Sequence, residues 1–257
     1  MINLLIAIGA GLVGFAAFFL TGALSDFSAS LVGTIVFGAA YFLLARRTLK
    51  QLEVIMLDAQ KDLMGARQGT SIIQARLDAG IARIQEGFAL SKWQFLVAGQ
   101  VHAQLGMILF MLEKYDEAKP HLEKAFGRIA QAKAMLGALH FKAKNVDEMV
   151  KAFETAVIAE KKNSLVWSTY AWCLRESGQR EKALEVLGRG VAAIPNDQRL
   201  KDNQLAAQNN EKLKMKPYGQ EWWAFRLEPP PMDFIPAGMR PQPGFRKGYR
   251  QPPKQRV

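Results

Sequence analysis

Three histidines are the side chains of this sequence that could most readily perform acid–base or metal chemistry. His102, His121 and His140 follow one another at intervals of 19 residues. Metal ligands on one helix need a spacing of three or four residues, because only those side chains share a face. The three histidines instead fall on three different predicted helices, so we expect no metal site.

Cysteine chemistry is limited to Cys173, which lies between Trp172 and Leu174 in a predicted helix. A lone cysteine forms neither an internal disulfide nor a thiolate zinc site, and its apolar neighbours favour a buried, unreactive thiol. The sequence also has no glycine-rich phosphate loop, no Gly-x-Ser-x-Gly elbow and no His-Glu-x-x-His pair. We therefore expect a protein that is not an enzyme and that needs no cofactor.

The composition divides the chain into three segments. Residues 1–45 are almost entirely apolar, residues 46–211 have the pattern of amphipathic helices, and residues 212–257 hold nine of the 11 prolines. The net charge of +11 is uneven, since the chain from residue 212 onward has ten Lys and Arg against three Asp and Glu. The protein thus has a basic tail rather than a basic fold.

The first apolar segment is long enough for two membrane spans. Residues 4–24 and residues 27–45 contain no charge, and only Ser25 and Asp26 separate them. Each stretch can cross a hydrocarbon core of about 30 Å as a helix. The short turn predicts an antiparallel transmembrane hairpin over residues 1–45, with Asp26 capping the second helix.

Arg46, Arg47 and Lys50 directly follow the second span. The positive-inside rule places them in the cytoplasm together with the N-terminus and the rest of the chain, and the same residues suit anionic lipid headgroups. A cleavable signal peptide carries basic residues before its apolar run, and here there are none. We expect an integral protein of a bacterial inner membrane, because the short hairpin and plain repeats suggest a bacterium.

Small residues in both spans predict close helix packing. Ala10 with Gly14, and Thr34 with Gly38, form small-x3-small pairs. The two spans could pack on each other only, or also bind another membrane protein or a second copy. Residues 46–70 continue as an amphipathic connector helix, which could lie on lipid, pack on the first of the helices that follow, or self-associate. We expect a break at residues 68–71, with Thr70 or Ser71 capping the next helix.

A spacing pattern then recurs three times. A pair four residues apart is followed three positions later by a small residue, in Ala118-x3-Leu122 with Ala125, Met149-x3-Phe153 with Ala156, and Ala183-x3-Leu187 with Gly190. Repeat intervals of 31 and 34 residues are typical of paired-helix solenoids.

This region, residues 71–213, resembles the tetratricopeptide repeat family. The Leu-Gly pair that opens each unit of the family corresponds to Leu105-Gly106 and Leu136-Gly137, and Tyr170-Ala171 takes that place in the third unit. Pro120 and Met149 depart from the family pattern. The resemblance implies an all-α fold of about three helical hairpins, with half a unit before them at residues 80–87 and a capping helix at residues 201–213.

The resemblance also implies that the first helix of each unit lines a concave groove for another protein. The partner-binding residues mapped there are Met107, Phe110, Met111, Ala138, Phe141, Trp172 and Arg175. These side chains are largely apolar, so the expected partner is a peptide or an amphipathic helix. An alternative is that the chain's own connector or tail fills the groove.

The tail, residues 214–257, carries large apolar side chains among its prolines, which a purely solvated linker rarely does. We predict that Trp222, Trp223 and Phe225 dock, on the solenoid in preference to a partner. The basic end, residues 246–256, could contact anionic lipid, whereas nucleic-acid binding has only charge and a few aromatic residues in its favour.

These features together predict a membrane-anchored scaffold that recruits a partner protein to the bilayer, with assembly of a membrane complex as one use. One alternative is a chaperone-like holder of apolar segments. Another is binding of anionic lipid or nucleic acid through the tail.

Overall fold

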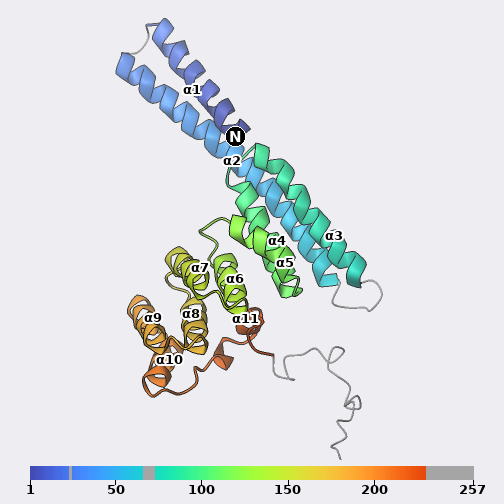
Figure 1. Cartoon of the computed structure of the whole chain (residues 1–257). Helices are drawn as coiled ribbons and strands as arrows, with labels where there is room; N and C mark the ends of the chain where they lie inside the picture. Colours follow the sequence, from blue (N-terminus) through green and yellow to red (C-terminus); the bar gives the residue numbers. More distant parts are fainter. Residues whose placement is uncertain (23–24, 66–72, 230–257) are drawn as a thin grey trace, which may run out of the picture.

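The computed structural model describes residues 1–22, 25–65 and 73–229, and every element within these ranges is helical (Figure 1). Two apolar helices, α1 (Ile2–Leu20) and α2 (Asp26–Gly65), form a hairpin that projects from a stack of shorter helices. The predicted all-α fold, with an apolar hairpin followed by helical repeats, is confirmed. The stack consists of α3 (Ile73–Glu86), the 3-10 helix η2 (Gly87–Lys92), α4 (Val97–Met111), α5 (Tyr115–Lys124), α6 (Ala130–Lys142), α7 (Val146–Ala159), α8 (Ser164–Glu176), α9 (Arg180–Ala193), α10 (Gln198–Gln208), the 3-10 helix η3 (Lys216–Tyr218) and α11 (Gln220–Trp223).

Glycines bring α1 and α2 into close contact. A Cβ atom on Gly11 would lie 2.8 Å from the Cβ of Phe37 and 3.0 Å from the carbonyl oxygen of Gly33. Helix backbones approach this closely only where side chains are absent, as in helices that pack within lipid. Of the predicted small pairs, Gly14 lies in this contact against a valine of α2, whereas a Cβ on Gly38 would meet nothing within 4 Å.

The second helix of the hairpin continues without a break into the rest of the molecule. α2 is 40 residues long, which corresponds to about 60 Å. Residues 39–64 contain neither glycine nor proline, so nothing interrupts the helix at the predicted boundary between span and connector at residue 45. Asp26 is the first residue of α2 rather than the residue before it, and the predicted break with Thr70 or Ser71 lies outside the described residues.

The distal part of α2 packs against α3 and completes the first helical hairpin of the stack. A Cβ on Gly80 of α3 would lie 2.8 Å from the Cγ of Leu63. Leu52 and Ala59 of α2 are buried in one cluster with Ile84 of α3 and with residues of α4. The sequence around Gly80 predicts only half a repeat unit, and α2 occupies the place of the missing half.

Three helical hairpins follow, α4–α5, α6–α7 and α8–α9, and α10 packs against the last of them. The residue in the turn of each hairpin has a left-handed backbone, with φ of 62° at Glu113, 57° at Lys144 and 81° at Gly178. These positions repeat at the same intervals as the sequence pattern. Side-chain oxygens of Asn145, Asn163 and Asp197 accept a backbone N–H and cap the helices that follow.

Large and small side chains alternate where the paired helices cross. A Cβ on Gly106 would lie 2.8 Å from the side chain of Leu122, and a Cβ on Gly137 would lie 2.6 Å from the ring of Phe153. The repeated pattern therefore marks the interior of each hairpin, where close packing stabilises the fold. The six paired positions of the pattern are all buried: Ala118, Leu122, Met149, Phe153, Ala183 and Leu187.

Candidate functional site: a concave face covered by the C-terminal strap

The first helices of the three hairpins, α4, α6 and α8, lie side by side and form one face of the stack (Figure 1). Residues 212–228, which we call the C-terminal strap, leave α10 and run across this face. Leu213 and Met215 are buried, while Lys212, Lys214 and Lys216 between and beside them are exposed. The strap therefore lies on the stack with one apolar edge inward and one basic edge toward solvent.

Asn203 of α10 holds the beginning of the strap. Its Oδ1 accepts the backbone N–H of Lys214 at 2.6 Å, and its Nδ2 donates to the Ser168 hydroxyl of α8 at 3.2 Å. The Ser168 hydroxyl also lies 2.8 Å from the Tyr218 hydroxyl. All three side chains are buried, and a buried polar network stabilises only when its members are bonded to one another. The network therefore defines the position of the strap along α8.

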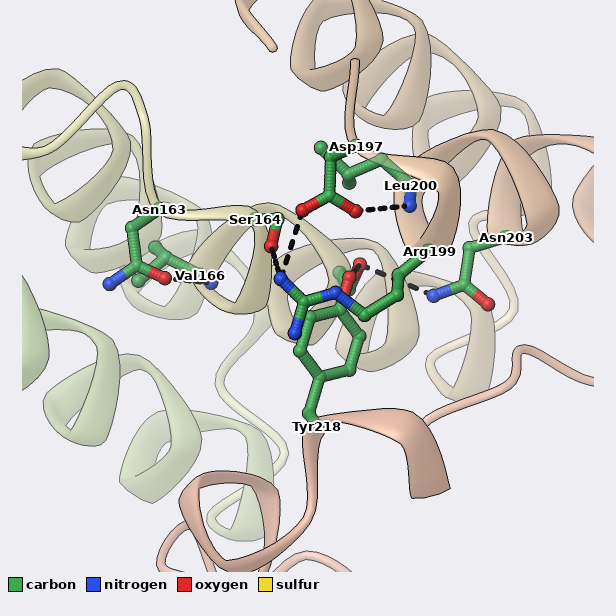
Figure 2. A network of polar contacts seen from close by, with 9 residues as sticks. Asn163, Ser164, Val166, Asp197, Arg199, Leu200, Asn203 and Tyr218 are labelled. Carbon is green, nitrogen blue, oxygen red and sulfur yellow. Dashed lines mark hydrogen bonds and ion pairs between the residues drawn. The ribbon is translucent and has the colours of Figure 1, made fainter. Parts of the chain in front are cut away.

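Arg199 lies over the ring of Tyr218 beside this network, and its side chain is 45% exposed (Figure 2). Its guanidinium lies 4.6 Å from the centroid of the Tyr218 ring and donates to Asp197 Oδ2 at 2.9 Å and to Ser164 Oγ at 3.1 Å. Asp197 also accepts the backbone N–H of Leu200 at 3.1 Å and so caps α10. One arginine thus connects the end of the repeats, the cap of α10 and the strap.

Aromatic packing holds the middle of the strap. Trp222 has no exposed surface, and its ring forms a T-shaped contact with Trp172 of α8 with the centroids 5.2 Å apart. Trp172 in turn meets Phe141 of α6 at 5.5 Å. Phe225 is 1% exposed and Trp223 8%. Aromatic side chains of this size bury on the order of 150–250 Å² each, so the strap belongs to the core of the domain.

Polar contacts hold the far end of the strap on α4 and α6. Arg226 donates from a guanidinium nitrogen to the carbonyl oxygen of Met111 at 3.1 Å, and Lys142 donates to the carbonyl oxygen of Arg226 at 2.6 Å. Arg226 also lies 3.7 Å from the carboxylate of Glu113. Burial lowers the pKa of the Lys142 ammonium. The strap therefore spans all three hairpins, from α10 to the end of α4.

Models of the tetratricopeptide repeat match two segments of the chain. One covers residues 99–129, which include α5 and most of α4, and the other covers residues 140–208, from the end of α6 to the end of α10. The helical repeats of these two segments are similar to tetratricopeptide repeats. No curated protein matches the chain. Tetratricopeptide repeats serve as protein–protein interaction modules, so the concave face of α4, α6 and α8 is the first surface to consider for a partner.

The structure corrects the predicted membership of this tetratricopeptide groove. Phe110 and Ala138 are fully buried, so neither can contact a partner. Phe110 points inward because it packs with Tyr115 across the first hairpin, with the ring centroids 5.4 Å apart. Phe141 and Trp172 are partly buried beneath the strap, and Arg175 forms an ion pair with Glu176 at 3.0 Å. Met107 is half-buried and Met111 is 39% exposed, both on α4, where the strap ends.

Two of the three histidines meet in the tetratricopeptide fold despite their separation in sequence. His102 of α4 and His121 of α5 have their Nδ1 atoms 3.0 Å apart, beside the ring of Phe88. Burial lowers the pKa of both imidazoles, and the charge of Lys124 lowers both further. No cluster of three metal-binding side chains occurs among the described residues. Periodicity within single helices could not reveal this pair, because it forms between two helices.

The Lys133 ammonium and the Cys173 thiol are two other buried polar groups. Lys133 of α6 is 9% exposed and donates to the carbonyl oxygens of Leu122 and Glu123, each at 3.0 Å, at the end of α5. Burial lowers the pKa of its ammonium. The Cys173 thiol is fully buried, and burial raises its pKa well above the usual value, which keeps it protonated and unreactive.

A polar cluster joins the hairpin to the repeats. The Asn3 amide of α1 donates to Thr48 Oγ1 of α2 at 2.9 Å and lies 3.5 Å from Gln94 Oε1, and all three side chains are buried. Gln94 donates to the Tyr41 hydroxyl at 2.8 Å. Sequence reasoning missed this cluster, although an asparagine at the start of an apolar span was a visible signal. The basic residues Arg46, Arg47 and Lys50 are exposed around it on α2.

Proposed function

We propose that this protein is a membrane-anchored interaction scaffold, with the hairpin in the bilayer and the tetratricopeptide repeats at its cytoplasmic face. The observation that carries the proposal is the continuity of α2, which belongs both to the hairpin and to the buried cluster of the first helical pair. A flexible linker would leave the repeats free to reorient. A shared helix instead presents them in one orientation to other components of the membrane.

The surface of the hairpin supports its place in lipid. α1 and α2 are long and apolar enough to cross a membrane, and large apolar side chains such as Leu12, Ile35 and Phe42 are more than half exposed. Arg46, Arg47 and Lys50 are exposed and are the first basic residues after the uncharged span of α2, which supports a cytoplasmic location for the repeats. The inner membrane of a bacterium is the setting we propose.

The contacts of α1 support a retained span rather than a cleaved signal sequence. The Asn3 side chain of α1 joins the buried cluster with Thr48 of α2. Removal of α1 would take the Asn3 donor out of this buried cluster and would uncover the glycine contact on α2, each of which is unfavourable.

We propose that the partner binds the concave face beside the end of the strap, around Met107 and Met111 of α4. Methionine side chains adapt to irregular apolar surfaces, so this patch suits a peptide or an amphipathic helix of another protein. A chaperone-like holder has less support, because it needs an open apolar groove and the strap covers Phe141 and Trp172. The basic end of the tail, residues 246–256, lies outside the described residues.

The anchor is tested by extracting native membranes with alkaline carbonate, which we expect to leave the full-length protein in the membrane fraction. The partner site is tested by placing a photocrosslinking amino acid at Met111 and, as a matched control, at Ile158, which is 67% exposed on α7. We expect one discrete protein adduct from Met111 and none from Ile158. Release by carbonate would contradict the anchor, and equal adducts at both positions would contradict the proposed surface.

A further inference from the structure

Trp93 and Phe95 are two exposed aromatic side chains with an unusual position in the fold. They lie in the turn between η2 and α4 and are 42% and 54% exposed. Single exposed apolar side chains are common in soluble proteins and need no explanation. These two side chains are of functional interest because of the position of their turn relative to the hairpin.

Hydrogen bonds attach the turn to the first residues of α1. The backbone N–H of Asn3 donates to the carbonyl oxygen of Trp93 at 3.2 Å. The amino group of Met1 donates to the carbonyl oxygen of Lys92 at 2.5 Å. The turn that carries Trp93 and Phe95 is therefore level with the beginning of α1.

The first charged residues after the uncharged span of α2 lie at the same level. Gln94 of the turn donates to the Tyr41 hydroxyl at 2.8 Å, and Thr48 bonds the Asn3 side chain. Arg46 and Arg47 lie between these two positions of α2 and are exposed. In a hairpin that spans a bilayer, this is the lipid–water boundary, where Trp and Tyr are enriched and basic side chains meet lipid phosphates.

We propose that Trp93 and Phe95 insert into the interfacial layer of the bilayer, beside the hairpin, on the same side as the repeats. The turn is then a third point of membrane contact, and it restrains the tilt of the repeats relative to the membrane. This inference rests on the proposed membrane anchor. The partner is the bilayer itself, with Lys92, Arg46 and Arg47 placed to contact the phosphates of the same leaflet.

Part of the backbone of the turn is hydrogen-bonded within the protein. The N–H groups of Trp93 and Gln94 donate to the carbonyl oxygen of Leu90 at 3.0 and 3.2 Å. The N–H of Val97 donates to the carbonyl oxygen of Gln94 at 3.3 Å. Backbone groups that enter a bilayer must find their partners within the protein, and these three amides have done so.

The fluorescence of the full-length protein tests the proposal, because Trp93 is the one exposed residue among the five tryptophans. We would reconstitute the protein in vesicles of phosphatidylcholine and phosphatidylglycerol that contain phosphatidylcholine brominated near the headgroup. We expect these lipids to quench part of the emission, and we expect Trp93→Phe to abolish that quenching. If the native protein and the variant are quenched equally, or if neither is quenched, the proposal is wrong.

Two reporters separate this proposal from the anchor on which it rests. In the Trp93→Phe background, Ile35→Trp reports the span and Leu205→Trp reports the solvent, since the native side chains are 61% and 57% exposed. Lipids brominated deep in the acyl chain should quench the tryptophan at position 35 and not that at position 205. If position 35 is quenched and Trp93 is not, the interfacial contact is wrong and the anchor stands. If position 35 is not quenched, the anchor itself is wrong.

Discussion

The rings of Trp222 and Trp172 form a T-shaped contact at a centroid distance of 5.2 Å, and this contact places the C-terminal strap on the concave face of the repeats. Trp172 belongs to the helix that the tetratricopeptide pattern assigns to the groove, and Trp222 comes from the tail. The chain itself therefore crosses the surface on which such repeats commonly bind a partner, from α8 to the end of α4.

Truncation of the central strap residue should weaken the whole domain. Trp222 is fully buried, so Trp222→Ala is expected to lower the free energy of unfolding by about 3–5 kcal/mol. Urea denaturation of the full-length protein in detergent, followed by circular dichroism, measures this loss. Leu205→Ala, at a position 57% exposed, is the control and should change the free energy of unfolding by less than about 0.5 kcal/mol. A loss at Trp222 no larger than that of the control would show that the strap is not part of the core.

A single methyl group should disrupt the second helical hairpin. In Gly137→Ala the new Cβ would lie 2.6 Å from the Phe153 ring, and we expect destabilisation of about 1–3 kcal/mol from the overpacking. Gly188→Ala in α9 is the matched control, because its nearest neighbour would be 3.6 Å away, and its higher helix propensity should stabilise by about 0.5–1 kcal/mol. The same denaturation experiment compares both variants, and effects of the same sign would contradict the packing seen at Gly137.

The left-handed turn residues offer a stabilising change. Lys144 has a φ of 57°, a region that glycine adopts without strain, so Lys144→Gly should raise the free energy of unfolding by up to about 1 kcal/mol. Gly178 occupies the equivalent turn of the third hairpin with a φ of 81°, and Gly178→Ala should lower the stability by a similar amount. Thermal unfolding of the two variants measures both effects. Unchanged melting temperatures would contradict the prediction, because the identity of the turn residue would then not affect the stability.

The buried lysine of α6 should stabilise through its hydrogen bonds rather than its charge. Lys133→Met leaves the carbonyl oxygens of Leu122 and Glu123 without their donor, and we expect a loss of about 1–3 kcal/mol. Lys151→Met is the control, because the Lys151 side chain is 71% exposed and its ion pair with Glu148 lies at the surface. If the two variants unfold at the same urea concentration, the helix-end contacts of Lys133 contribute nothing measurable.

The histidine pair should make the stability sensitive to mild acid. The folded state lowers the pKa of His102 and His121, so the unfolded chain binds protons more tightly. The stabilisation is then complete above the ordinary histidine pKa of about 6.5, and it is lost as the pH falls below that value. Two protonated rings would also direct donors at each other across the 3.0 Å contact between their Nδ1 atoms.

Thermal unfolding at pH 7.5 and pH 5.5 measures this effect in the native protein and in His102→Gln. We expect a smaller decrease in melting temperature on acidification in the variant, because one titrating ring is gone and the amide can still bond His121. His140 also has a pKa lowered by burial, but it is present in both proteins and cancels in the comparison. An identical decrease in both proteins would show that the pair does not control the acid sensitivity.

Periodicity identifies the apolar hairpin and the helical repeats because both are local. An uncharged stretch predicts a span from residues 4–24 alone, and the spacing of Ala118 and Leu122 predicts a buried face from one helix. The same reasoning fails for Phe110, because a position on the first helix of a unit can face either the groove or the second helix. That choice depends on how Tyr115 packs across the turn.

The sequence by itself determined which segments are apolar, helical or proline-rich, because these properties depend on neighbours within a few residues. Only the tertiary structure decided which of their surfaces meet. The distal part of α2 completes the first helical pair, His102 contacts His121, and Arg226 bonds Met111 across 115 residues of chain. Such contacts form because a folded chain must bury its apolar edges and bond its buried polar groups, and no local pattern records the partner that each one finds.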